Sequence, residues 1–126
     1  MSTRRILIVD DEDDIREVAQ VSLEMVAGWE VLTASSGSAG LAIANSNHPD
    51  AILLDVMMPD MDGPTTFQKL RADQNIRNIP VILLTAKLQA SDRNQFASLG
   101  VAGVLAKPFD PLQLASQVSE VLHWAR

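Results

Sequence analysis

The sequence has no cysteine and no long hydrophobic run. Without cysteine the chain can form no disulfide, offers no thiolate nucleophile and binds no metal through a thiolate. The longest unbroken apolar stretches have four residues, such as Ile6–Val9, whereas a membrane span needs about 20. A brief apolar run followed at once by acids also differs from a secretory signal. We therefore expect a soluble protein of the cytoplasm, without membrane insertion.

Positive charge is also scarce in this chain. Ten Lys and Arg residues stand against sixteen Asp and Glu, which leaves a formal net charge of −6. This charge disfavours a domain that itself binds nucleic acid or anionic lipid. The chain has 126 residues, of which 47% are apolar, close to the average for one folded domain. We expect residues 1–126 to form a single domain, with no output domain in this chain.

Five short apolar runs, most of them rich in Ile, Val and Leu, recur along the chain. They are Ile6–Val9, Val31–Leu32, Ala51–Leu54, Val81–Leu84 and Val101–Ala106. Most do not alternate apolar with polar residues, which is typical of strands buried on both faces of a parallel sheet. Segments with helical spacing separate the runs, so strand and helix alternate five times. This order predicts an α/β fold: a doubly wound, five-stranded parallel sheet of the flavodoxin-like (βα)5 type, with strand order 2-1-3-4-5.

The first helical segment has side chains at a spacing that places them on one face, and Gly28 is expected to stop it. That face contains Ile15, Val18, Ser22, Met25 and Val26. Asp13 or Asp14 is expected to cap its N-terminus.

Other residues predict the starts of later helices. Ser36 is a candidate N-cap for the second helix. The pairs Gly63-Pro64 and Asp110-Pro111 each place a proline just inside a predicted helix start, where its missing N–H has no cost.

Polar residues directly follow four of the five runs. Asp10 and Asp11 follow the first run, Asp55 the third, Thr85 the fourth and Lys107 the fifth. In the predicted strand order these four carboxyl ends surround one crevice, while the second strand, which ends without an ionisable residue, lies at the outer edge. Taken singly, each residue has an ordinary explanation, as a helix-terminal acid, a turn former or a surface charge. Their convergence on one rim favours a functional site.

The charges of this rim indicate what it would bind. Three aspartates and one lysine sum to −2, so a divalent cation would relieve their mutual repulsion. Oxygen ligands without His or Cys favour a hard ion, Mg²⁺ first of all. Asp55 would then act as a nucleophile towards a phosphoryl group and form an acyl phosphate. Lys107 and the cation would stabilise the transferring group, and the Thr85 hydroxyl would donate a hydrogen bond to it.

Four motifs in this order resemble a known family. Asp10-Asp11, the segment Asp55–Gly63 (DVMMPDMDG), Thr85-Ala86 and Lys107-Pro108-Phe109 resemble the receiver domain of bacterial two-component response regulators, of the kind found in chemotaxis regulators. The resemblance extends from Arg4 to about Trp124. It implies a phosphoacceptor regulator rather than an enzyme, one that catalyses only its own phosphorylation and dephosphorylation and shifts conformation to control a partner or output.

The resemblance also implies a role for each residue of the site. Asp55 would be the phosphoacceptor and a Mg²⁺ ligand. Asp11 would bind Mg²⁺ directly, Asp10 would assist, often through water, and the backbone carbonyl of Met57 would complete the protein ligands.

The phosphoryl oxygens would be bound by Thr85 and Lys107, and the resemblance predicts a cis Lys107–Pro108 bond. The phosphoryl donor would be a histidine of a partner sensor kinase or phosphotransfer protein. His48 and His123 of this chain would be surface residues without a part in the reaction.

The sequence departs from the family pattern at one informative position. Many members have a Tyr or Phe ring, which turns inward on phosphorylation, where this chain has Val104. Either the motion of Thr85 is then read directly by the face of the fourth helix, fifth strand and fifth helix, or the output uses another surface. Met57 and Lys87 occupy positions that flank the phosphoryl group in this family and would give an acyl phosphate of moderate lifetime.

Other readings of the chain are a degenerate receiver that works as a phosphorylation-independent interaction module, and a phosphatase of the haloacid dehalogenase type. The phosphatase needs a second acid two residues after its nucleophile, where this chain has Met57, whereas a degenerate receiver would have lost part of the acidic site, which is intact here. A nucleotide-binding switch lacks its Gly-rich loop here. A flavin phosphate would be repelled by the acids after the first strand.

Overall fold

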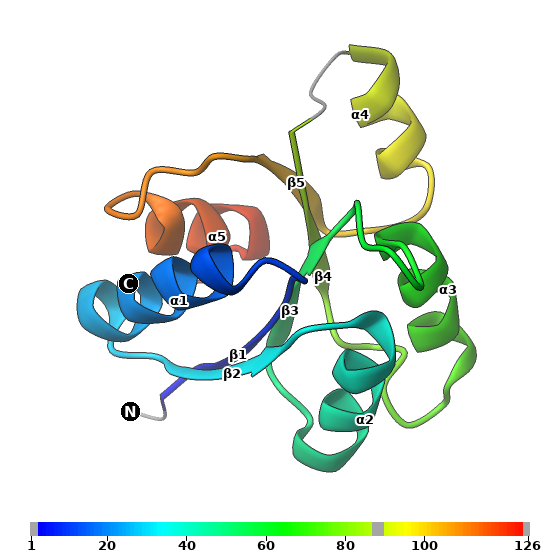
Figure 1. Cartoon of the computed structure of the whole chain (residues 1–126), viewed down its shortest axis with the longest axis horizontal. Helices are drawn as coiled ribbons and strands as arrows, with labels where there is room; N and C mark the ends of the chain where they lie inside the picture. Colours follow the sequence, from blue (N-terminus) through cyan, green and yellow to red (C-terminus); the bar gives the residue numbers. More distant parts are fainter. Residues whose placement is uncertain (1–2, 87–89, 125–126) are drawn as a thin grey trace.

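Five parallel strands form one sheet in the order β2-β1-β3-β4-β5, as predicted (Figure 1). The computed structural model describes residues 3–86 and 90–124. The strands are β1 (Arg5–Val9), β2 (Glu30–Ala34), β3 (Ala51–Asp55), β4 (Val81–Thr85) and β5 (Gly103–Ala106). The helices are α1 (Asp13–Ser22), the π-helical η1 (Leu23–Ala27), α2 (Gly37–Asn47), α3 (Gly63–Ala72), α4 (Ala90–Ala97) and α5 (Leu114–Leu122). No helix in the described ranges is long and apolar enough to cross a membrane.

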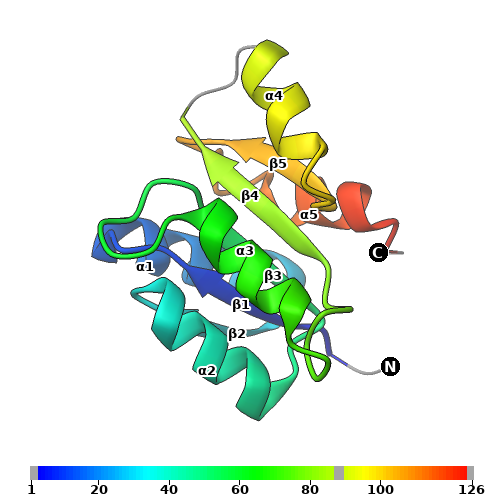
Figure 2. The ribbon, with the colours of Figure 1, turned by 90° about the vertical axis from the view of Figure 1, so that its right-hand side faces the viewer.

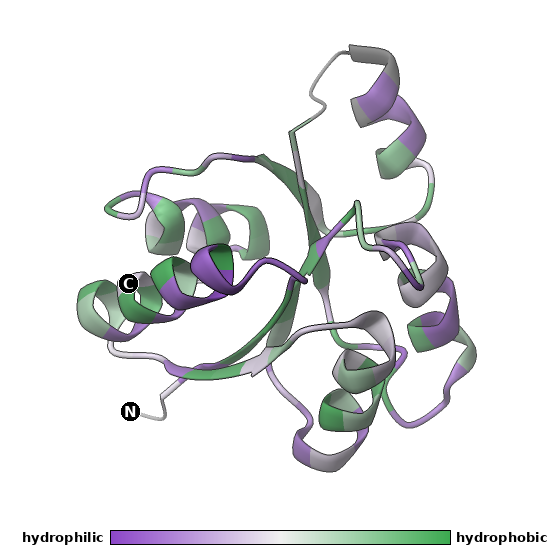
Figure 3. Ribbon diagram, in the orientation of Figure 1, coloured by the Kyte–Doolittle hydropathy of each residue, from purple (hydrophilic) through white to green (hydrophobic). Residues whose placement is uncertain are grey.

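Helices cover both faces of the sheet, which is why its central strands are apolar throughout. Helices α1 and α5 lie on one face, and α2, α3 and α4 on the other (Figures 1 and 2). Alternate residues of a strand serve the two faces: Ile6 and Ile8 pack in the α1/α5 layer, while Leu7 and Val9 pack in the opposite layer. All five residues of β3 and of β4 are buried. Apolar colouring accordingly concentrates along the strands in Figure 3.

The predicted face of the first helix is wrong in part. The buried residues are Ala19, Ser22 and Leu23, whereas Val18 is 41% and Met25 80% exposed. The apolar residues here outnumber those that the sheet can cover, so helical spacing alone did not identify the packed side. The helix also changes to π-helical geometry at Leu23, which shifts the residues after it around the axis. Gly28 ends it in the left-handed conformation, as predicted (φ 70°).

The predicted helix starts had mixed outcomes. The Ser36 hydroxyl accepts a hydrogen bond from the Ala39 N–H (3.1 Å), and Pro64 lies in the first turn of α3, both as predicted. The expected cap of α1 by Asp13 or Asp14 is wrong, because Glu12 is the N-cap and makes no side-chain cap hydrogen bond. The Asp110-Pro111 pair is also not the start of α5.

That pair instead begins a turn before α5. Its Asp110 carboxylate accepts the Leu112 N–H (2.9 Å) and its carbonyl accepts the Leu114 N–H (3.0 Å). The buried Ser22 hydroxyl donates to the carbonyl of Pro111, which fastens this turn to α1. A side chain from another helix thus holds the segment before α5, and local sequence gives no sign of such a contact.

Candidate functional site

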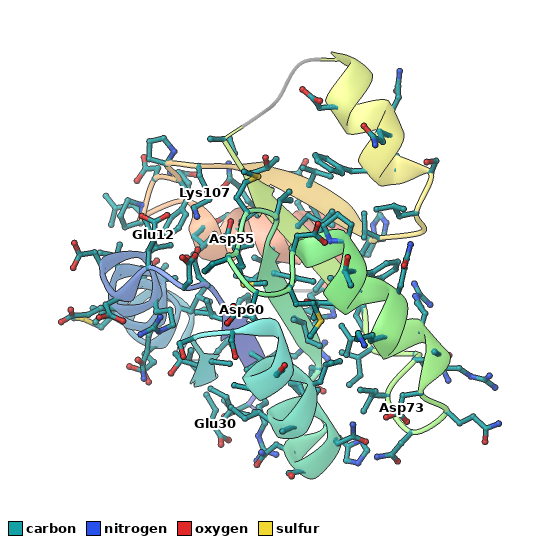
Figure 4. The ribbon with its side chains drawn as sticks, turned by 45° about the vertical axis from the view of Figure 1, so that its right-hand side comes forward. Glu12, Glu30, Asp55, Asp60, Asp73 and Lys107 are labelled. Carbon is teal, nitrogen blue, oxygen red and sulfur yellow. The ribbon has the colours of Figure 1, made fainter. Side chains whose placement is uncertain are left out.

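The carboxyl ends of β1, β3, β4 and β5 bring the predicted site residues to one edge of the sheet. Asp10 follows β1, Asp55 and Thr85 are the last residues of β3 and β4, and Lys107 follows β5. The register pairs Asp55 with Leu84 and Thr85 with Ala106, so the strand ends are level. In Figure 4 the labelled Asp55 and Lys107 lie close together at this edge.

Lys107 is the cation of this cluster and contacts three carboxylates. Its Nζ lies 2.9 Å from Oδ2 of Asp10, 3.2 Å from Oδ1 of Asp55 and 3.4 Å from Oε1 of Glu12. Burial opposes the charged form of the amine, but the hydrogen bond and charge of Asp10, followed by those of Asp55, outweigh it and raise the pKa of Lys107. The ammonium group therefore stays charged at neutral pH.

Asp55 lies in the least favourable surroundings for a negative charge. The residue is 2% exposed. Burial and then the charge of Asp10 raise the pKa of Asp55 to about 6, although Lys107 and the Met57 N–H, 3.4 Å from Oδ1, lower it. Within the described part of the chain, its buried Oδ2 atom has no hydrogen-bond partner. One oxygen is thus held by Lys107 and the other has a free acceptor capacity.

The acids at this edge suit a hard divalent cation. One carboxylate oxygen from each of Asp10, Asp11 and Asp55 lies within 4.8 Å of the other two, and among the described residues these acids form a group that could hold a metal. Opposite ligands of Mg²⁺ are about 4.2 Å apart, and this ion prefers carboxylate oxygens together with water. Asp11 is exposed, which leaves room for water, whereas Asp10 is fully buried. The unpaired Oδ2 of Asp55 adds a donor atom to this fit.

Asp10 also organises the backbone that precedes α1. Its Oδ1 accepts the Glu12 N–H (2.9 Å), and its carbonyl accepts a hydrogen bond from the Arg16 guanidinium (2.7 Å). Both contacts hold the segment between β1 and α1, so the position of Asp10 is set by the chain on either side of it.

The remaining predicted residues lie around this cluster. Thr85 is buried (1% exposed) and the side chain of Met57 is 64% exposed. The Lys107–Pro108 bond is cis, as predicted. Gly63 packs so closely on the end of β3 that a Cβ would lie 2.5 Å from the Asp55 carbonyl oxygen. A larger residue at this position would displace the backbone that carries Asp55. Lys87 lies outside the described residues.

The two histidines and Val104 are not among the residues that line the cavity at this cluster. His48 and His123 are exposed, as predicted, and end α2 and α5. Val104 is partly buried against the α2/α3/α4 layer and pairs with Leu83 in the sheet.

A cavity of about 310 Å³ opens onto this cluster. Its wall includes Asp55, Lys107, Glu12, Ile15 and Met57. Sequence reasoning did not identify Glu12 as a residue of this site. Its adjacency to the acid pair was a signal, but whether a long exposed side chain reaches Lys107 depends on the fold.

The family follows from a comparison with known sequences. A family model described as the response regulator receiver domain matches residues 6–119. The chain belongs to this family. It is therefore a receiver domain of two-component signalling, as the four motifs predicted, and not a classical enzyme. Receiver domains work with histidine kinases and typically bind Mg²⁺ at an acidic pocket.

Similar proteins agree with this assignment. The chain is 42% identical over 118 residues to the DNA-binding dual master transcriptional regulator RpaA of Synechocystis. The match covers 94% of this chain and 48% of RpaA. It is 39% identical over 122 residues to the phosphate regulon regulatory protein PhoB of Pseudomonas aeruginosa, covering 97% of this chain and 53% of PhoB. The receiver domain thus spans about half the length of these curated relatives.

Solved structures confirm the fold. The chemotaxis protein CheY4 of Vibrio cholerae superposes with a TM-score of 0.88 at 32% identity, covering 95% of this receiver domain and 99% of CheY4. A response regulator of Chloroflexus aurantiacus gives a TM-score of 0.87 at 34% identity, with 97% and 99% coverage. The doubly wound, flavodoxin-like prediction is therefore correct.

Proposed function

We propose that this receiver domain accepts a phosphoryl group on Asp55 from a phosphohistidine of a partner sensor kinase or phosphotransfer protein, in a Mg²⁺-dependent reaction. The observation that carries the proposal is the state of the Asp55 carboxylate. It is buried, one oxygen is 3.2 Å from the Lys107 ammonium, and the other has no hydrogen-bond partner among the described residues. The carboxylate thus has one oxygen for the cation and, once Lys107 turns to the phosphoryl group, one oxygen for the phosphorus atom. The absence of cysteine suits a reaction in the cytoplasm.

The ligands that we assign to Mg²⁺ are Asp11, Asp10, Asp55 and the backbone carbonyl of Met57, with Asp10 acting in part through water. When bound, the cation supplies charge to neutralise the transferring phosphoryl group. Two of these ligands, Asp10 and Asp55, each contact the Lys107 ammonium, which supports the assignment.

The protein residues divide the remaining work. An oxygen of Asp55 forms the new P–O bond, the P–N bond of the donor breaks, and the imidazole nitrogen keeps the electron pair. Lys107 turns from the Asp55 oxygen to a phosphoryl oxygen, and Thr85, at the end of the neighbouring strand, donates its hydroxyl to another. The phosphorylated residue carries about −2 in a buried place, where the carboxylate carried −1, and this added charge biases the surrounding loops towards a second conformation.

The conformational change at the phosphorylated site cannot be transmitted by an inward-turning aromatic ring, because Val104 has no ring. We infer that the motion of Thr85 is passed through β5, since Thr85 pairs with Ala106 two residues beyond Val104.

The first test is phosphorylation by a small donor. The purified chain is incubated with acetyl phosphate and Mg²⁺ and its intact mass is measured. We expect a gain of one phosphoryl group that is absent in Asp55→Asn and in the presence of a chelator. No gain in the wild type would favour the degenerate receiver. Rapid release of inorganic phosphate from many substrates would favour the phosphatase.

A groove of about 460 Å³ beside the acceptor cavity is where we place the donor protein. Half-buried and exposed apolar side chains line it, among them Val18, Val21 and Met25 on one side and Leu112 on the other. Both hollows are lined from the first helix, and Ile15 of the acceptor cavity is one helical turn from Val18 of the groove. A partner seated there presents its histidine to Asp55.

Polar substitutions in this groove should weaken transfer from a protein but not from a small molecule. For the double variant Met25→Ser, Leu112→Ser we expect roughly a tenfold slower transfer from a purified, phosphorylated phosphotransfer domain that labels the wild type. The rate with acetyl phosphate should stay within about twofold. Met57 lines the acceptor cavity, so Met57→Ser would bear on both reactions. Gln68→Ser, at an exposed position of α3 outside the groove, is the control and should leave both rates unchanged. Equal losses with both donors would contradict this assignment.

A further inference from the structure

Glu12 differs from the other two carboxylates that contact Lys107. Its Oε1 lies 3.4 Å from Nζ, yet its side chain is 61% exposed, whereas those of Asp10 and Asp55 are 0% and 3% exposed. Glu12 also lines the cavity that leads to Asp55. In Figure 4 its label lies next to Lys107 and Asp55, on the side of α1. Glu12 therefore stands at the mouth of the acceptor site.

The charge of Glu12 is the one that the reaction leaves unchanged. Asp10 shares its charge with a bound cation, and Asp55 transfers its charge to the phosphoryl group when the acyl phosphate forms. The exposed carboxylate of Glu12 has no such compensation beyond Lys107. It repels any anion that enters the cavity, and it competes with the phosphoryl oxygens for the Lys107 ammonium.

We propose that Glu12 is a specificity-determining and positioning residue that slows phosphorylation of Asp55 by small, highly charged phosphodonors. Free acyl phosphates enter the cavity as dianions and are repelled by the Glu12 carboxylate, with no other contact to the protein that offsets the repulsion. A donor protein brings its own binding surface, which offsets the repulsion through contacts away from the cavity. The inference rests on the proposed function, because it requires Asp55 to be the acceptor.

The step itself is the same for either donor class. With acetyl phosphate, an oxygen of Asp55 forms the P–O bond, the P–O bond to acetate breaks, and acetate leaves with the electron pair. No proton has to move. Glu12 takes no part in these bonds and acts through charge and through its contact to Lys107.

The test compares Glu12→Gln with the wild type under saturating Mg²⁺, with the rate of phosphoryl incorporation followed by intact mass. For a dianion roughly 6 Å from the carboxylate, Coulomb's law in water gives roughly a tenfold acceleration at low salt and roughly threefold at 0.15 M salt. Phosphoramidate carries one net negative charge fewer than acetyl phosphate. Its acceleration should be roughly the square root of that seen with acetyl phosphate.

Two further variants separate position from general charge. Glu12→Asp keeps the charge and should stay within about twofold of the wild type. Glu17→Gln removes an exposed charge from the same helix, away from Lys107, and should have no effect. Unchanged rates in Glu12→Gln, an equal acceleration with both donors, or the same acceleration in Glu17→Gln would overturn the inference. A wild type that takes no phosphoryl group on Asp55 would refute the proposed function itself.

Discussion

Replacing Lys107 by methionine is expected to lower the free energy of unfolding by about 3–5 kcal/mol at pH 7.5 without divalent metal. The Lys107 side chain is 11% exposed and its ammonium contacts two buried carboxylates, Asp10 and Asp55. Methionine fills the same space but leaves both charges uncompensated in a poorly solvated place. Urea denaturation, followed by circular dichroism in buffer with a chelator, measures the loss.

The pH dependence of that loss identifies its cause. Lys107 lowers the pKa of Asp55, so in the variant Asp55 binds its proton at a higher pH and part of the cost is relieved in mild acid. The loss should therefore be smaller at pH 5 than at pH 7.5. Lys69→Met removes the same charge from an exposed position of α3 and should change stability by less than about 0.5 kcal/mol. A loss no larger than that of the control would contradict the account.

Asp55→Asn should have the opposite effect and stabilise the metal-free protein. The pKa of Asp55 rises from 3.8 to about 6 on folding, so the folded state holds a proton that the unfolded state has released between these values. Stability contributed by the protonated carboxyl is complete below pH 3.8 and is lost as the pH rises through about 6. Asparagine removes this loss. At about 1.36 kcal/mol per pKa unit, we expect a gain of about 2–3 kcal/mol above pH 7 and almost none near pH 4.

Chemical denaturation across this pH range, in chelator, tests that expectation. Asp60→Asn, at an exposed position after the same strand, is the matched control and should show no comparable gain. Added Mg²⁺ should narrow the difference, because the wild type binds the ion better and is stabilised by mass action. If the gain does not depend on pH, or if Asp55→Asn is less stable than the wild type, folding does not disfavour the charged form of Asp55.

The fold was predictable from sequence because buried parallel strands leave a strong signal. The runs at residues 52–54 and 81–84 are apolar throughout, and the structure buries them completely. The convergence of Asp10, Asp55 and Lys107 then follows from topology, since the ends of parallel strands meet at one edge. Residues whose position is set by the backbone of a strand are therefore within reach of sequence reasoning.

Contacts made by long side chains, or between helices, could not be predicted from the sequence. The contact of Glu12 with Lys107 joins segments 95 residues apart and depends on the rotamer of an exposed side chain. An exposed face of α1 and η1 was mistaken for the packed face because Val18 and Met25 are apolar although they are exposed. In both cases the position of the side chain depends on contacts between distant segments, which local periodicity does not record.

The most direct measurement of the central claim locates the phosphoryl group. The chain is incubated with acetyl phosphate and Mg²⁺ and reduced with borohydride, which converts an acyl phosphate to an alcohol. Tandem mass spectrometry of the peptides should then find homoserine in place of Asp55, at that position alone and only when Mg²⁺ was present. A reduced residue at Asp10, Asp11 or another acid, or an unreduced Asp55 in protein that has gained phosphoryl mass, would contradict the account.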